Sequence, residues 1–240
     1  MEWIIIYLVA GALIIPVFIY GLIAQSKVNS TFDKYSKAYA KNGITAAELA
    51  HKLLHSGDIT NVNVEKINGN LTDCYDSKNK VLKLSSNVYN SSSIAALGVC
   101  AHEVGHALQD KQKSFMFRLR LIVIPFTNFI SRAFIPLIFI GAILNSLFFL
   151  PSIGYYITLF SVITYGGSLL VYFVTLPLEY DASKKAIALL ESTGTLDETE
   201  LPGARKVLVA AIHTYVAAFL SSLIYFLRFL SIIMMFRDRD

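Results

Sequence analysis

Four long apolar stretches limit what this chain can fold into more than any other feature of its sequence. They cover residues 3–24, 129–150, 153–176 and 207–236, and each is long enough to cross a bilayer as a helix, which takes about 20 residues. Hydrophobic residues make up 55% of the chain and charged residues only 16%, which is more apolar surface than one soluble core can bury. We therefore expect a mainly α-helical integral membrane protein with four transmembrane helices.

The first stretch, Trp3 to Ala24, has the hydrophobicity of a signal peptide but not its pattern. Glu2 precedes it in place of a positively charged segment, and the stretch is longer than the apolar part of a signal peptide. We interpret it as a retained membrane helix.

Two polar segments, residues 25–120 and 178–206, separate the apolar stretches. The first is predicted to fold into a small α+β portion. The elements predicted in it are a helix from the capping box Thr45–Glu48 to His55, strands at 62–67 and 81–84, and a helix over about 94–112.

Both polar segments are predicted to lie on one side of the membrane, because the two spans of 121–177 form a hairpin between them, joined at Pro151-Ser152. Positively charged residues gather in and beside these segments, which favours the cytoplasmic side, with both termini outside. The net charge of +4 fits basic flanks at a membrane surface, so lipid is an expected partner and nucleic acid is not. The basic residues are Lys27, Lys34, Lys37, Arg118, Arg120, Lys184, Lys185, Arg205 and Lys206.

His102, Glu103 and His106 form a His-Glu-x-x-His motif in the helix predicted over 94–112. Residues four apart lie on one face of a helix, so both imidazoles can bind one metal ion, and imidazole nitrogen suits Zn²⁺. Glu103 follows the first ligand and is placed to take a proton from a zinc-activated water and to hand it to the leaving amine. The motif therefore predicts peptide-bond hydrolysis with one zinc ion per chain.

A catalytic zinc ion needs a third protein ligand and an open fourth position. Gln109 and Gln112 stand where the metzincin pattern requires Gly and His, which excludes that class. The other common solution is a glutamate from a later helix, and Glu179 is predicted to begin such a helix on the same side of the membrane. Asp181 is the alternative ligand, or else an acceptor for the free N–H of a ligand histidine.

The blocks Leu71–Asp76, Val81–Ser85 and Leu176–Ser183, with the motif and the four-span layout, resemble the neutral zinc metallopeptidases of bacterial membranes, the YugP-like family (zinc peptidase family 2). The resemblance covers nearly the whole chain. It implies a membrane-bound zinc peptidase with the motif residues and Glu179 in the roles described above.

A more distant similarity is to membrane proteases of the HtpX and CAAX prenyl protease type. This chain departs from these patterns at two positions. Ser183 stands where the distant relatives carry an aspartate, and Cys74 stands where the family often has a histidine. The two cysteines, Cys74 and Cys100, are expected to be reduced thiols, with Cys100 a small buried helix residue.

Two residues near the cytosolic start of the fourth span are further candidates. His213 and Tyr215 could each donate a hydrogen bond to the oxyanion of the tetrahedral intermediate, with Tyr215 preferred, or His213 could support the site from outside the ligands. Interfacial anchoring is the alternative role for Tyr215. Arg228, deeper in this span, is interpreted as a helix–helix contact or as a side chain that reaches toward the interface.

Two weaker patterns have a structural explanation as well as a functional one. His51 and His55 share the i, i+4 spacing of the motif, but Lys52 follows His51 in place of a glutamate, so a polar helix face explains them. The strand at 81–85 could pair with an extended substrate backbone, or it could simply pack on the motif helix.

The sequence thus predicts a membrane-bound zinc metalloendopeptidase with a zincin-like catalytic portion at the cytoplasmic face of a bacterial cell membrane. Its substrates are expected to be membrane or membrane-proximal proteins or peptides. The alternative is a non-catalytic membrane scaffold with a structural zinc site. The predicted division is a transmembrane helix at 1–24, a catalytic segment at 25–120, a two-helix hairpin at 121–177, a cytoplasmic segment with the third ligand at 178–206, and a transmembrane helix with a short tail at 207–240.

Overall fold

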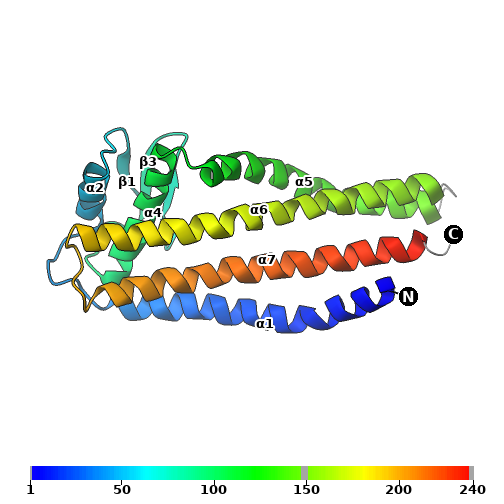
Figure 1. The fold of residues 1–240 in the computed structure, drawn as a ribbon, viewed down its shortest axis with the longest axis horizontal. Helices are drawn as coiled ribbons and strands as arrows, with labels where there is room; N and C mark the ends of the chain where they lie inside the picture. The colour runs from blue at the N-terminus through cyan, green and yellow to red at the C-terminus, as the bar shows by residue number, and fades with distance from the viewer. Residues whose placement is uncertain (1, 147–150, 238–240) are drawn as a thin grey trace. The chain divides into compact units, whose positions relative to one another are not determined.

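The computed structural model describes residues 2–146 and 151–237, and it is mainly helical with one small sheet (Figure 1). The predicted tail residues 238–240 lie outside the described residues. The elements in chain order are α1 (Glu2–Ser36), α2 (Ala46–Ser56), β1 (Asn63–Ile67), β2 (Cys74–Asp76), β3 (Val81–Ser85), α3 (Ser86–Tyr89), α4 (Ile94–Lys111), α5 (Phe115–Ser146), α6 (Pro151–Ser192) and α7 (Leu201–Arg237).

Four of these helices, α1, α5, α6 and α7, are long and apolar enough to cross a membrane. This confirms the prediction of a mainly helical chain with four candidate spans and a small sheet. The division into five segments stays a prediction. The turn predicted at Pro151-Ser152 is misplaced, because both residues belong to α6, where proline suits the first helical position. Residues 147–150, which precede them, lie outside the described residues.

The chain divides into two compact units. The span unit comprises Met1–Leu22, Leu119–Thr175 and Tyr215–Asp240, and the sheet unit comprises Ile23–Arg118 and Leu176–Thr214.

The described residues of the span unit place large apolar side chains on the outside of the helices, as lipid-facing helices do. Phe134, Tyr165 and Phe229 pack their rings together inside it. Arg228 donates a hydrogen bond to the Tyr7 hydroxyl at 2.8 Å and lies over the Tyr7 ring, which confirms that Arg228 marks a helix–helix contact.

The sheet unit contains a three-stranded sheet in the order β1-β3-β2. β3 runs parallel to β1 and antiparallel to β2, so both of its edges are occupied. The prediction that the strand at 81–85 could receive a substrate backbone is therefore wrong. The sequence patterns also missed β2, a strand of three residues that forms one edge of the sheet.

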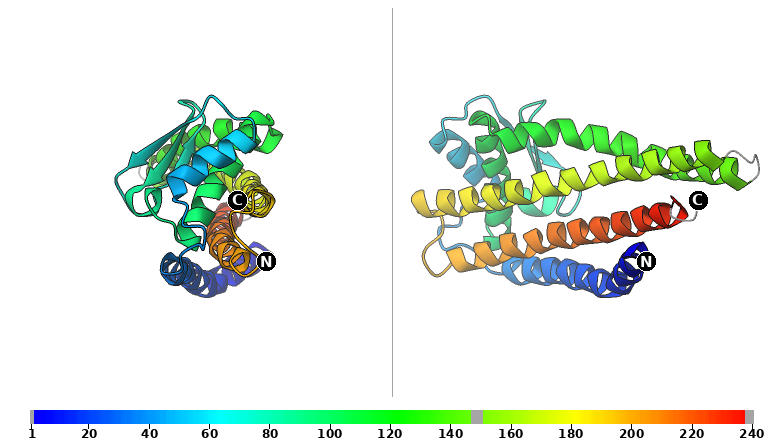
Figure 2. Two further views of the ribbon diagram at one scale, coloured as in Figure 1. Left: turned by 90° about the vertical axis from the view of Figure 1, so that its left-hand side faces the viewer. Right: turned by 45° about the vertical axis from the view of Figure 1, so that its right-hand side comes forward.

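Helices α2 and α4 pack against this sheet and form the core of the sheet unit (Figures 1 and 2). The capping box of α2 is present as predicted: Thr45 accepts from the Glu48 backbone N–H, and the Glu48 carboxylate accepts from the Thr45 N–H. Helix α4 begins after Ser93, whose hydroxyl accepts from a backbone N–H of the first turn. The core leucines of these elements are fully buried: Leu49, Leu53, Leu82, Leu84 and Leu97.

Helix α6 differs from the prediction in one way that bears on function. The sequence led us to expect a new helix beginning at Glu179, where the chain leaves the third span. Instead α6 continues through Pro177 to Ser192. Proline removes one backbone hydrogen bond, but long apolar helices tolerate it. Glu179 therefore projects from the middle of a long helix rather than from a first turn.

Candidate metal centre

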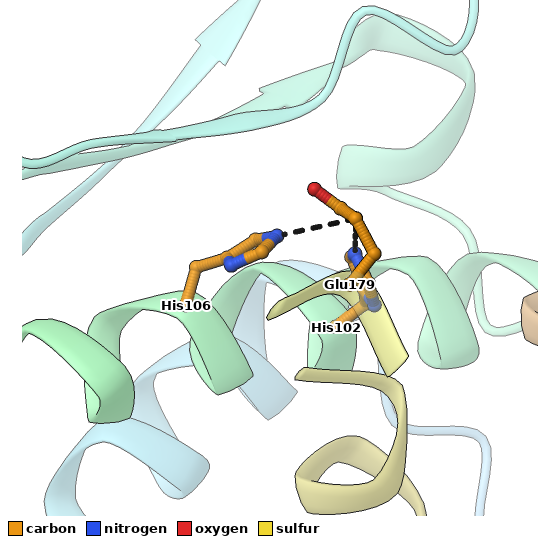
Figure 3. A group of neighbouring side chains, drawn as sticks. All are labelled: His102, His106 and Glu179. Carbon is orange, nitrogen blue, oxygen red and sulfur yellow. Dashed lines mark hydrogen bonds and ion pairs between the residues drawn. The ribbon is translucent and has the colours of Figure 1, made fainter. Parts of the chain in front are cut away.

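Three side chains of the sheet unit meet at one point: His102 and His106 from α4, and Glu179 from α6 (Figure 3). Glu179 Oε2 lies 3.1 Å from Nε2 of His102 and 3.6 Å from Nε2 of His106. One ligand atom from each residue lies within 4.8 Å of the other two. The side chains are 15%, 8% and 3% exposed for His102, His106 and Glu179, so the group is enclosed but open on the His102 side.

The close approach of α4 to α6 brings these residues together. Gly105 lies between the two histidines, and a Cβ atom placed on it would be 2.6 Å from the backbone oxygen of Ala182. Such a distance is too short for any side chain, so only glycine lets the two helix backbones come this near. Ala182 itself is fully buried and lies three residues beyond Glu179. The geometry of the group therefore depends on two small residues that carry no reactive atom.

A chain of hydrogen bonds holds His106 through Nδ1, the ring nitrogen that does not face Glu179. Its Nδ1 lies 2.9 Å from Gln109 Oε1, and Gln109 Nε2 donates to the Leu178 carbonyl at 2.9 Å and to the Asp181 carboxylate at 2.8 Å. Asp181 in turn forms an ion pair with Lys185. Because Gln109 accepts through Oε1, His106 carries its proton on Nδ1 and leaves Nε2 free to bind a metal.

These hydrogen bonds correct the role that we predicted for Asp181. Asp181 was our alternative to Glu179 as third ligand, or else an acceptor for the free N–H of a ligand histidine, but Gln109 stands between its carboxylate and His106. Gln109 entered the sequence analysis only as a residue that excludes another class of site. Its position three residues after His106, on the same face of the helix, is the signal that would have identified it.

His102 has its own support from α6. Ser183 Oγ lies 3.2 Å from His102 Nδ1, so the hydroxyl can accept the Nδ1 proton while Nε2 faces Glu179. The residue that departs from the pattern of the distant relatives therefore still contacts a histidine of the group. A serine holds the ring without adding the negative charge that an aspartate would bring.

Glu103 is 8% exposed, and the edge strand β2 holds it. Its Oε2 accepts a hydrogen bond from the backbone N–H of Tyr75 at 2.8 Å. Tyr75 is fixed in turn, since its hydroxyl donates to Asp110 at 2.7 Å. Burial and this hydrogen bond raise the pKa of Tyr75 above its ordinary value, so the phenol stays protonated. The neighbouring thiol of Cys74 also has a raised pKa, because its sulfur is partly desolvated and the Glu103 carboxylate lies nearby.

Comparison with known proteins identifies the family. A family model described as "Putative neutral zinc metallopeptidase" matches residues 10–234. The chain belongs to this family. It is 40% identical over 217 residues to "Putative membrane protease YugP" of Bacillus subtilis (strain 168), covering 90% of this chain and 93% of that relative. No solved structure matches. The resemblance inferred from the motif and its flanking blocks is thereby confirmed.

The donor set fits the zinc ion that the family name implies. Two ligands that each lie about 2.0–2.1 Å from a tetrahedral zinc ion are about 3.4 Å apart. The two distances from Glu179 Oε2 to the histidine nitrogens, 3.1 and 3.6 Å, lie on either side of this value. Two imidazole nitrogens and one carboxylate oxygen are also the ligands of one common class of catalytic zinc sites.

The remaining candidates are not members of the three-residue group. His213 is a partly buried residue of α7 in the sheet unit and is not among the three grouped ligands of the described residues. Tyr215 belongs to the span unit, so its role at the site stays a prediction. His51 and His55 are exposed on α2, as a polar helix face requires. Cys100 is buried and Cys74 exposed, and both are free thiols, as predicted.

Proposed function

We propose that this protein is a membrane-bound zinc metalloendopeptidase that hydrolyses peptide bonds in membrane or membrane-proximal proteins. The observation that carries the proposal is the grouping of His102, His106 and Glu179, with Glu103 next to the first histidine on the same helix. The family and the relative that is named a membrane protease support the same reaction class. We assign one zinc ion to each chain.

In this proposal His102, His106 and Glu179 hold the zinc ion and Glu103 moves the proton. Zinc, when bound there, supplies a Lewis acid that makes water a better nucleophile and polarises the scissile carbonyl. The Tyr75 N–H holds Glu103 Oε2, so Oε1 is the oxygen that accepts the proton of the attacking water. As the new C–O bond forms and the C–N bond breaks, Glu103 returns that proton to the leaving amine.

The free edge of β2 is our candidate for the substrate position. The Tyr75 N–H points away from β3 toward Glu103, so this edge of the sheet faces the proposed base. An extended peptide can add to such an edge through backbone hydrogen bonds. The Tyr75 N–H is already used, so the substrate would pair with the backbone groups that flank it. Strand addition selects extended, unfolded segments rather than folded surfaces.

We further propose a bacterial cell membrane as the location, with the sheet unit on the cytoplasmic side. The concentration of Lys and Arg beside the ends of the spans supports this orientation. Tyr215 remains our candidate oxyanion donor. If Tyr215→Phe leaves turnover of a peptide substrate unchanged, that role is excluded.

The zinc content of the full-length chain purified in detergent tests the metal centre without a known substrate. We expect about one zinc ion per chain in the wild type and a loss of at least about tenfold in affinity for Glu179→Ala. Glu191→Ala is the matched control, because it removes an exposed carboxylate from the same helix. Zinc retained by Glu179→Ala would move the third ligand elsewhere, and no zinc in folded wild type would overturn the proposal.

Glu103→Gln separates an enzyme from the alternative, a scaffold with a structural zinc site. An enzyme keeps its zinc in this variant and loses turnover of unfolded casein by about 100-fold or more. A scaffold keeps both its zinc and its cellular function. Casein is a suitable first substrate, because its extended segments need no recognition beyond strand addition.

A further inference from the structure

A cavity of about 550 Å³ opens between the C-terminal part of α1 and the beginning of α7. All of its lining residues belong to the sheet unit, and none belongs to the metal centre. Four are cationic and three carry hydroxyl groups: Lys27, Lys34, Arg205, Lys206, Ser30, Thr31 and Tyr35.

The four cations of this cavity are not paired with a carboxylate of the described residues. Among the described residues none of them forms an ion pair, whereas five other lysines of the sheet unit do. Four positive charges around one cavity repel one another, and an anion bound between them relieves that repulsion. Thr31 adds a hydroxyl donor on one side, and the Ser30 hydroxyl beside it donates to the Lys27 carbonyl at 3.3 Å. This set of donors, without a carboxylate, suits a phosphate group.

The position of the cavity along its helices indicates what the phosphate is attached to. On α1 the apolar stretch ends at Ala24, one turn before Lys27. On α7 the apolar stretch begins at Val207, directly after Lys206. Both helices therefore change from apolar to basic at the cavity, which is the pattern found at the headgroup level of a bilayer.

The margin of the cavity is apolar on the membrane side. Val209 and Ala210 line it one turn beyond the basic pair of α7, and Val209 is 46% exposed. On α1, Ile23 is 58% exposed, one turn before Lys27. A free phosphate ion cannot bury these apolar side chains, whereas the glycerol and acyl part of a lipid covers them.

We propose that this cavity binds the phosphate of an anionic membrane lipid such as phosphatidylglycerol. Lys27, Lys34 and Lys206 neutralise the headgroup, and the Arg205 guanidinium can hold two phosphate oxygens at once. The ligand lies at the end of two helices that enter the sheet unit, so the same contacts anchor the sheet unit at the membrane surface. The proposal does not depend on peptidase activity.

Native mass spectrometry of the full-length chain, released from detergent and titrated with dioleoyl phosphatidylglycerol, tests this site. The wild type should bind one phosphatidylglycerol more tightly than further copies, and more tightly than dioleoyl phosphatidylcholine. The double variant Lys34→Gln/Lys206→Gln removes one cation from each helix and should weaken the first binding step by about tenfold or more. Lys66→Gln/Lys78→Gln is the matched control, because it removes two exposed lysines outside the cavity and should bind as the wild type does.

Two further measurements keep the test decisive. Circular dichroism melting in detergent confirms that the double variant is folded, and Lys34→Arg/Lys206→Arg, which keeps both charges, should restore binding. Equal weakening of the two Gln double variants would overturn the proposal, since only net charge would then matter. Excess inorganic phosphate distinguishes the ligand source: if it displaces phosphatidylglycerol completely, the site is a soluble-anion site and the lipid assignment fails.

Discussion

The two units of this protein bury polar groups in different ways. In the sheet unit the buried polar side chains have partners: Ser85 bonds to Asp73, Gln109 bonds to three groups, and Glu179 meets two histidines. In the described part of the span unit, Thr127 and Ser231 donate to backbone carbonyls of their own helices, and the hydroxyls of Ser161 and Thr175 are buried without a hydrogen-bond partner. A buried polar group with a specific partner fixes one arrangement of its neighbours, whereas one without a partner does not.

The two units also differ in where they place their large apolar side chains. Side chains such as Phe129, at 73% exposure, and Ile122, at 70%, project from the span unit, where lipid accepts any apolar shape. The sheet unit instead buries Leu82, Leu84 and Leu97 completely against one another. We conclude that function in the sheet unit depends on individual residues, whereas the span unit depends mainly on apolar character. Substitutions of the same kind should therefore have different effects in the two units.

The largest difference should come from a pair of glycine substitutions. Gly105→Ala places a Cβ 2.6 Å from the Ala182 backbone oxygen, so α4 and α6 must move apart and the ligand group opens. We expect a loss of stability of about 3 kcal/mol and at least tenfold weaker zinc binding. Zinc titration and thermal unfolding in detergent would measure both effects.

Gly167→Ala is its counterpart in the span unit. A Cβ at Gly167 meets nothing within 4 Å, so alanine should leave zinc binding unchanged and raise stability by up to about 1 kcal/mol through helix propensity. Similar losses in both variants would show that the two units do not differ in the way we describe.

The second prediction concerns Gln109, which connects His106 to Asp181 and to the Leu178 carbonyl. Gln109→Leu fills the same space but removes the hydrogen bonds to His106 Nδ1, to the Leu178 carbonyl and to the Asp181 carboxylate. We expect zinc affinity to fall by about 10–100-fold. Gln112→Leu makes the same chemical change at an exposed position of the same helix end, and its zinc affinity should match the wild type. Equal affinities in the two variants would remove Gln109 from the site.

Sequence reasoning found those parts of the site that depend on local spacing. His102 and His106 are one helical turn apart, so their common face follows from the sequence alone. Glu179 followed from a topological argument about which segments share one side of the membrane. The three residues could therefore be named before their distances were known.

The parts that the sequence did not reveal depend on contacts between distant segments. β2 is only three residues long, too short for a strand pattern, and it exists because it pairs with β3 and bonds to Glu103. The need for glycine at 105 arises from Ala182, which is 77 positions away along the chain. We also missed that α6 continues to Ser192, because the change from an apolar to a polar composition near residue 178 does not by itself end a helix.

A pair of serine substitutions tests the difference between the two units through moderate changes in the free energy of unfolding. Ser85 and Ser161 are both fully buried. The Ser85 hydroxyl donates to Asp73 Oδ2 at 2.7 Å, so Ser85→Ala should cost about 1–2 kcal/mol. Ser161→Ala removes a hydroxyl that has no partner among the described residues, and should be neutral or slightly stabilising. Chemical unfolding followed by circular dichroism would measure both, and a larger cost for Ser161→Ala would contradict our account of the span unit.

The smallest effect should come from a polar contact between α1 and α7 in the described span unit, the hydrogen bond from Arg228 to Tyr7. Tyr7→Phe keeps the ring under Arg228 but removes the 2.8 Å hydrogen bond, so the cation–π contact survives and only the hydroxyl contribution is lost. Hydrogen bonds between membrane helices contribute about 0.6 kcal/mol on average, and we expect a decrease in stability of that size with zinc affinity unchanged. Arg228→Met, which also removes the cation, should cost more in the same unfolding measurement and again leave zinc affinity unchanged. If Tyr7→Phe instead weakened zinc binding as Gln109→Leu is expected to do, the metal centre would depend on specific contacts in the span unit, and the contrast between the two units would have to be abandoned.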